Sequence, residues 1–156
     1  METSVGHTVS VQTAATRGIA AVRTRLPARR VAAVFAGYLD QVYAAARYGA
    51  VHLDGQNVFV YRGSGPDDEV EVDFGVGVTA PFPPAGPVQY AELPTGEVAT
   101  TTHWGDYGRL GEAHAAVIAW CQANGREPAG PRWEVYGHWN PSEGPPRTDV
   151  YYLLAR

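Results

Sequence analysis

The sequence predicts an α+β domain in which a strand–helix–strand–strand unit occurs twice, forming an antiparallel sheet with two helices on one face. Three observations support this fold class. Apolar residues recur with helical spacing over 31–46 and again over 110–121. A pair of strand-like segments, rather than a single strand, follows each helical stripe. The same order then repeats, which indicates an internal duplication with repeats at about 9–80 and about 88–154.

In the first repeat, residues 9–26 have β-branched alternation at both ends and are interrupted near Gly18, which predicts one kinked strand. The helical stripe of 31–46 follows, and Gly49 supplies its stop signal. Strands are expected at 57–63 and 69–78, joined by the turn-forming residues 64–69.

The second repeat begins after a proline-rich bridge, residues 79–87, whose composition predicts a stiff extended spacer. Residues 88–104 are expected to form an extended strand or a hairpin. The second helical stripe consists of Leu110, Ala113, Val117 and Trp120 or Cys121, and it closes at Asn124 and Gly125. Two final strands, 132–139 and 148–154, are joined by a turn rich in proline and glycine.

The composition narrows the classes of function. The chain has 156 residues, of which 45% are hydrophobic and 11% aromatic, as expected for one globular domain spanning 1–156. The net charge of -4 argues against a broad cationic surface for nucleic acid. Every basic residue is an arginine, which excludes chemistry based on a lysine nucleophile. The single cysteine, Cys121, rules out an intramolecular disulfide, and a cytoplasmic location without a membrane span is expected.

Glu134 stands out in the stretch RWEVYGHW, where it lies among two tryptophans and a tyrosine. Strand alternation places Glu134 on one face with Arg132, Tyr136 and His138. The opposite set, interpreted as core under the helices, consists of Trp133, Val135, Gly137 and Trp139. A charge among rings is what a ligand cleft requires, because a buried carboxylate needs a partner and a cation can supply it. The alternative from the spacing alone is a salt bridge between Glu134 and an arginine at a solvated edge.

The histidines offer no metal motif. His103, His114 and His138, together with Asp106, lack the spacing of known metal sites, so we expect neither a metal nor another cofactor.

Two long segments, THWGDYGRLGEAHAAVIAWCQANG and RWEVYGHWNPSEGPPRTDVYYLL, resemble the GyrI-like or AraC-type effector-binding domain family. The resemblance covers nearly the whole chain from about Val9. It implies a tandem duplication with a ligand cleft on the pseudo-two-fold seam, used in the family for lipophilic, often cationic aromatic compounds. The resemblance places Glu134 at the floor of this cleft, with Tyr136 and Tyr107 as walls.

Further candidate ligand-binding residues are aromatic side chains and one histidine, for which ordinary core or surface packing is the alternative: Trp104, Tyr90, Tyr152, His138, Tyr38 and Phe59. Many relatives carry this domain behind a DNA-binding region, for which this chain has no room. We therefore expect a free-standing member without direct contact to nucleic acid.

Three functions stay open at the level of sequence. The first is the binding of hydrophobic aromatic cations, with Glu134 supplying the charge. The second is an enzyme, since some relatives hydrolyse cyclopropane-bearing alkylating natural products, and a carboxylate in an apolar pocket suits general acid–base catalysis. In that case Glu134 is the catalytic residue. The third is a protein-interaction domain.

Overall fold

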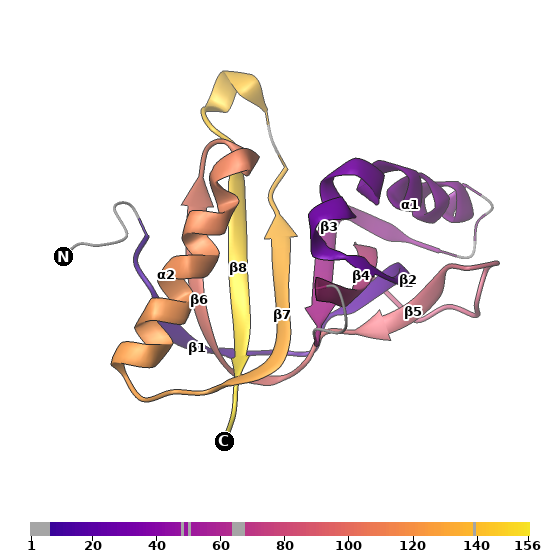
Figure 1. Cartoon of the computed structure of the whole chain (residues 1–156). Helices are drawn as coiled ribbons and strands as arrows, with labels where there is room; N and C mark the ends of the chain where they lie inside the picture. Colours follow the sequence, from indigo (N-terminus) through magenta and orange to yellow (C-terminus); the bar gives the residue numbers. More distant parts are fainter. Residues whose placement is uncertain (1–6, 48, 50, 64–67, 139) are drawn as a thin grey trace. The chain divides into compact units, whose positions relative to one another are not determined.

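The structure is a computed structural model that describes residues 7–47, 49, 51–63, 68–138 and 140–156. Eight strands and two α-helices occur among them, and all strand pairs within each unit are antiparallel, so the predicted α+β class is confirmed. The chain divides into two compact units. Unit 1 comprises residues 1–15 and 94–156, and unit 2 comprises residues 16–93. Figure 1 shows the elements of both units, which are described separately here.

Unit 1 has four strands in the order β1-β6-β8-β7. These are β1 (Ser10–Ala14), β6 (Gly96–Trp104), β7 (Pro128–Tyr136) and β8 (Arg147–Leu154). The helix α2 (Leu110–Ala123) packs on β6 and β8, as Figure 1 shows. Two short 3₁₀ turns complete the unit, η3 (Tyr107–Arg109) before α2 and η4 (Pro141–Glu143) before β8.

The core of unit 1 lies between α2 and one face of its sheet. Alternate residues of β8, namely Thr148, Val150, Tyr152 and Leu154, are buried, as a strand covered on one face requires. The helix contributes the predicted stripe of Leu110, Ala113, Val117 and Cys121 to the same cluster. Gly125, with φ of 64°, ends α2 in a left-handed conformation, and the amide of Arg126 bonds to the carbonyl of Cys121 at 3.0 Å.

Unit 2 has four strands in the order β3-β4-β2-β5. These are β2 (Gly18–Pro27), β3 (Leu53–Arg62), β4 (Glu69–Val78) and β5 (Gln89–Glu92). The helix α1 (Val31–Ala46), preceded by the 3₁₀ turn η1 (Ala28–Arg30), packs on β2 and β4. Aromatic rings dominate this contact, since Tyr38 stacks on Phe74 at 5.0 Å and Phe59 meets Phe74 edge-on at 5.2 Å.

Two predicted strands are wrong in the same way. The kinked strand of 9–26 is two strands, of which β1 pairs with β6 in unit 1 and β2 with β4 in unit 2. Residues 88–104 do not form a hairpin either, because β5 pairs with β2 while β6 pairs with β1 and β8. The first short strand of each repeat therefore belongs to the sheet of the other, a partner choice that local periodicity does not encode.

The strand register aligns the two repeats residue by residue. Phe59 faces Phe74 across β3 and β4, and Glu134 faces Val150 across β7 and β8. Two pairs further along, Tyr61 faces Val72 and Tyr136 faces Thr148. Glu134 thus occupies in unit 1 the place of Phe59 in unit 2, and Tyr136 the place of Tyr61.

The predicted faces of β7 are wrong. Glu134 lies opposite Val150 and bonds to a residue of α2, so its set faces the helix. Trp133 and Val135, expected under the helices, lie on the other face and are nevertheless buried. Alternation alone could not tell which face of β7 meets the helix, because residues on both faces are buried. Trp139 and most of the turn predicted at 64–69 lie outside the described residues.

Candidate functional site

Glu134 is a buried acid at the helix-covered face of unit 1. It is 5% exposed and extends from the third-last residue of β7 toward α2. Burial of a carboxylate costs several kcal/mol, roughly, unless hydrogen bonds or opposite charge stabilise it. The surroundings of Glu134 therefore determine what this part of the molecule can do.

Four side chains form a continuous hydrogen-bonded chain through Glu134. The hydroxyl of Tyr136 donates to Oε1 at 2.6 Å, and Oε2 lies 2.7 Å from Nε2 of His114 on α2. The other imidazole nitrogen, Nδ1, lies 2.7 Å from the hydroxyl of Tyr152 on β8. Two strands and the helix thus contribute to one polar group, which we call the Glu134 chain: Tyr136, Glu134, His114 and Tyr152.

Tyr152 closes the buried end of the Glu134 chain. Burial, with a smaller contribution from the charge of Glu134, raises the pKa of Tyr152 from its ordinary value to about 12, while the charge of Arg132 opposes the rise. Its phenol consequently keeps its proton at neutral pH. It can donate to Nδ1 of His114 or accept a hydrogen bond from it, depending on the tautomer of the ring.

Tyr107 gives the Glu134 chain an exposed end. Its ring meets that of Tyr136 at 5.7 Å in a tilted arrangement, and 46% of Tyr107 is accessible to solvent. Glycine and aspartate precede it, and the carboxylate of Asp106 caps the turn by accepting from the amide of Gly108. The rings of Tyr107 and Tyr136 therefore lead from the surface to the buried carboxylate.

Thr148 adds an unsatisfied polar group on the same face. Its hydroxyl is the one buried side-chain polar atom without a hydrogen-bond partner among the described residues. Thr148 lies directly opposite Tyr136 across β7 and β8. Its counterpart in unit 2 is Val72, so the repeat architecture does not require a hydroxyl at this place.

Three of the sequence-predicted residues lie in unit 2 and form no part of the Glu134 chain. Tyr38 and Phe59 both contact the buried ring of Phe74. Tyr90 on β5 contacts Phe82 at 6.0 Å between ring centroids and donates a hydrogen bond to Glu92 at 3.0 Å. The predicted cleft on the seam depends on how the two units are placed, and it stays a prediction.

The remaining two candidates are separated from Glu134. Trp104 is 58% exposed at the end of β6, and it lies on the sheet face away from α2, under the guanidinium of Arg147 at 5.5 Å. This face has a hollow of about 330 Å³ with a polar lining that includes Trp104, Arg147, Asp149 and Tyr151. His138 lies two residues after the end of β7 and is exposed.

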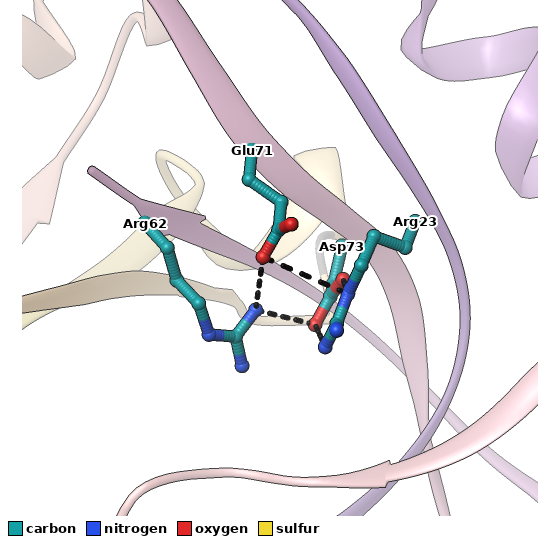
Figure 2. A network of polar contacts seen from close by, with 4 residues as sticks. All are labelled: Arg23, Arg62, Glu71 and Asp73. Carbon is teal, nitrogen blue, oxygen red and sulfur yellow. Dashed lines mark hydrogen bonds and ion pairs between the residues drawn. The ribbon is translucent and has the colours of Figure 1, made fainter. Parts of the chain in front are cut away.

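Arginines form a separate network in unit 2, shown in Figure 2. Asp73, 1% exposed, accepts hydrogen bonds from Nε of Arg23 and from an amino nitrogen of Arg62, both at 2.7 Å. Glu71 lies within 4.0 Å of both guanidinium groups and balances the second positive charge. This arrangement stabilises a buried aspartate by charge pairing within the sheet.

Sequence reasoning missed His114 as a member of the site. A single histidine on a helical stripe has no motif, and it was considered only as a metal ligand. A comparison of the repeats provides the missing signal, because His114 is the fifth residue of α2 and Phe35 is the fifth residue of α1. Phe35 is 37% exposed but contacts Phe59 of the sheet, so a histidine at the matching position of the other repeat marks a departure from an apolar helix–sheet contact.

The fold and the buried Glu134 chain define an α+β domain with a polar site under a helix. The sequence matches the family described as GyrI-like small molecule binding domain over residues 7–154. The chain belongs to this family, as the sequence resemblance implied. The finding assigns it to a class of domains that bind small molecules.

Solved structures share this fold at low sequence identity. The C-terminal domain of EcmrR has a TM-score of 0.75 and 16% identity, with 97% of this chain and 99% of that chain covered. The structure of SAV2435 bound to tetraphenylphosphonium has a TM-score of 0.65 and 10% identity, covering 95% of this chain and 94% of that one. A hydrolase from Listeria innocua has a TM-score of 0.61 and 11% identity, covering 94% and 91%. No curated protein has significant sequence similarity to the chain.

Proposed function

We propose that this protein binds small lipophilic cations with delocalised charge, and that the carboxylate of Glu134 is their charged contact. The observation that carries the proposal is a 5% exposed carboxylate bonded to the hydroxyl of Tyr136, whose ring in turn contacts the exposed ring of Tyr107. A cation that reaches this carboxylate gains charge pairing in a medium of low polarity. Contact with each ring contributes about 0.5 to 2 kcal/mol more.

The family supports the ligand class in a general way. Its members are small-molecule-binding domains, and SAV2435 has been solved with tetraphenylphosphonium, a cation of the proposed kind. Such an ion is large, aromatic and weakly hydrated, so its transfer out of water costs less than the transfer of a primary ammonium group. A buried acid lined by rings matches these properties.

Calorimetric titration with tetraphenylphosphonium tests the proposal directly. We expect saturable binding to the wild type and at least about tenfold weaker binding to Glu134→Gln. This variant preserves the shape of the side chain but removes its charge, and a tenfold loss corresponds to about 1.4 kcal/mol of binding free energy. Tetraphenylborate, an anion of the same shape, serves as the ligand control and is expected not to bind. Equal affinity of the wild type and Glu134→Gln, or the absence of saturable binding, would contradict the proposal.

A second candidate, a hydrolase of cyclopropane-bearing alkylating compounds, is favoured by one contact. The 2.6 Å hydrogen bond from Tyr136 to Glu134 places a proton donor beside a general base. In the proposed reaction, Glu134 takes a proton from water as the water oxygen bonds to a cyclopropane carbon. The strained C–C bond breaks, and Tyr136 gives its proton to the atom that receives the electron pair. Glu134 then passes the proton taken from water to Tyr136 through their hydrogen bond, which restores both groups.

Mass spectrometry distinguishes the two candidates. A hydrolase converts a cyclopropane-bearing alkylator into a product heavier by the mass of one water molecule, and Glu134→Gln abolishes the conversion. Tight binding without any such product supports the binding function alone. The hydrolase from Listeria innocua makes this assay worthwhile, although the likeness to it concerns only the fold.

A further inference from the structure

The same helix–sheet contact is polar in one repeat and apolar in the other. In unit 2, Phe35 of α1 contacts Phe59 of β3 with ring centroids 5.8 Å apart. The corresponding residues of unit 1, His114 and Glu134, meet at 2.7 Å. The two pairs occupy equal positions by helix start and by strand register.

This comparison separates function from packing. The fold accommodates two phenylalanines at this contact, so neither the helix nor the sheet needs an ion pair there. Replacing a buried ion pair by packed apolar residues is often neutral or stabilising, by about 1 to 4 kcal/mol. A histidine and a glutamate at such a place therefore point to a role other than stability.

The hydrogen bonds of the Glu134 chain suit two protonation states of His114 without any movement. In the imidazolium form, Nε2 donates to Glu134 and Nδ1 donates to the hydroxyl oxygen of Tyr152. In the neutral form, Nε2 still donates to Glu134, while the Tyr152 hydroxyl, which keeps its proton, donates to Nδ1. The same two contacts serve both states.

The charged and titratable groups around His114 come from every element that packs on it. From β7 these are Glu134, Tyr136 and Arg132, from β8 Tyr152, from β6 the buried His103, and from α2 itself Cys121. Glu134 is the group in direct contact with the imidazole, at 2.7 Å. Arg132 faces Tyr152 across β7 and β8, and its charge lowers the pKa of that phenol.

We propose that His114 carries a proton in the ligand-free protein and releases it when a cation binds to Glu134, so that His114 determines which cations the site accepts. The inference rests on the proposed function. It adds the positive charge that neutralises Glu134 before the ligand binds and that the ligand then replaces. Before binding, the imidazolium neutralises Glu134. After binding, the ligand does so, and the proton passes from Nδ1 to bulk solvent.

Selectivity follows from this exchange. A cation must compete with an imidazolium already in place, and it must leave water to do so. Primary ammonium and alkali cations lose strong hydration and gain no more charge pairing than the imidazolium provides. Phosphonium and quaternary aromatic ammonium ions lose little hydration and gain ring contacts with Tyr136 and Tyr107. The site therefore selects delocalised cations by means of its own histidine.

Calorimetric titration with tetraphenylphosphonium in two buffers of different ionisation enthalpy measures the proton exchange. We expect the wild type to release about one proton per bound ion, with the apparent Kd falling by up to about tenfold per pH unit while His114 is protonated. His114→Gln keeps a donor toward Glu134 but cannot ionise, so its binding is expected to release no proton and to be independent of pH.

Two further variants serve as controls. His52→Gln changes an exposed histidine of unit 2 and is expected to behave like the wild type. His114→Phe introduces into α2 the residue type that α1 has at Phe35, and it too is expected to bind without proton release. If His114→Gln fails to fold, His114→Phe provides the same comparison.

The possible outcomes separate the inference from the proposed function. Binding by the wild type without proton release, or unchanged release in both His114 variants, overturns the inference and leaves the proposed function standing. Absence of binding at every pH overturns the proposed function and the inference with it. The ligand-free state has its own test, since nitrogen NMR of His114 at mildly acidic pH is expected to show two protonated ring nitrogens, and one protonated nitrogen overturns the inference alone.

Discussion

Tyr152 illustrates how a single buried residue couples this site to the stability of the fold. Its hydroxyl lies 2.7 Å from His114, and only 6% of the residue is exposed. Because its pKa is about 12 in the folded chain and about 10 in model compounds, the unfolded chain loses the phenolic proton first. The neutral phenol therefore favours the folded state until the solution becomes strongly alkaline.

The predicted consequence is a fall in stability between about pH 10 and about pH 12. Below about pH 10 the contribution of Tyr152 is complete, and above about pH 12 it is lost, with a total change of about 2 to 3 kcal/mol. Urea unfolding at several alkaline pH values measures the slope. Tyr152→Phe has no phenolic proton and is expected to show a shallower slope than the wild type. Identical slopes in the two proteins would show that this residue does not carry the effect.

At the scale of elements, the buried acid of strand β4 is stabilised by arginines from the two neighbouring strands. Asp73 is held by Arg23 from β2 and Arg62 from β3 in the network of Figure 2. Arg62 is the less exposed of the two guanidinium groups, with 27% of its side chain accessible against 54% for Arg23. Its loss leaves Asp73 with a partner that water screens more strongly.

Arg62→Gln is therefore expected to lower the free energy of unfolding by about 1 to 3 kcal/mol, a range reduced to allow for the partial exposure of the guanidinium. The matched control is Arg29→Gln in the exposed turn η1, for which we expect a change within about 0.5 kcal/mol. Chemical denaturation of the three proteins gives the comparison. Equal stabilities of the two variants would mean that the network contributes nothing beyond general surface charge.

The elements that the sequence predicted well are those encoded by local spacing. The helical stripe beginning at Val31 gave the bounds of α1, and the alternation ending at Leu154 gave β8, because both periodicities arise within the segment itself. Glu134 also indicated a site from local sequence alone. A charge within an apolar strand is visible without knowledge of its neighbours.

What the sequence did not reveal are relations between segments. Trp133, Glu134 and Val135 are all buried, so alternation could not tell which face meets the helix. His114 lies twenty residues before Glu134, and only the packing of α2 on the sheet joins the two. The partner of β1 was hidden too, because its alternation fits any open sheet edge.

At the scale of the whole molecule, the exchange of the short strands links distant parts of the sequence. Val11 of β1 packs against the core cluster of unit 1, whose buried members all come from residues 99–154. A change in β1 should therefore destabilise the unit that carries Glu134, although the two residues are far apart in sequence. The neighbouring Gln12 is exposed and provides a control on the opposite face.

Val11→Asp is expected to destabilise unit 1 by about 2 kcal/mol or more, because it places a charge against apolar residues. Gln12→Asp should change stability by less than about 0.5 kcal/mol. All four tryptophans of the chain lie within residues 94–156, so tryptophan fluorescence during unfolding reports on unit 1. Similar unfolding midpoints for Val11→Asp and Gln12→Asp would contradict the assigned packing of β1.

The division of the chain also has a consequence for its synthesis on the ribosome. Unit 2 is continuous from 16 to 93, so every strand of its sheet has left the exit tunnel while the rest is still being translated. Unit 1 needs β1, which precedes unit 2 in the chain, together with β6, β7 and β8, which follow unit 2. The nascent chain must therefore carry β1 unpaired until β6 has emerged, after the whole of unit 2, and the sheet that carries Glu134 is complete only once β8 has been made.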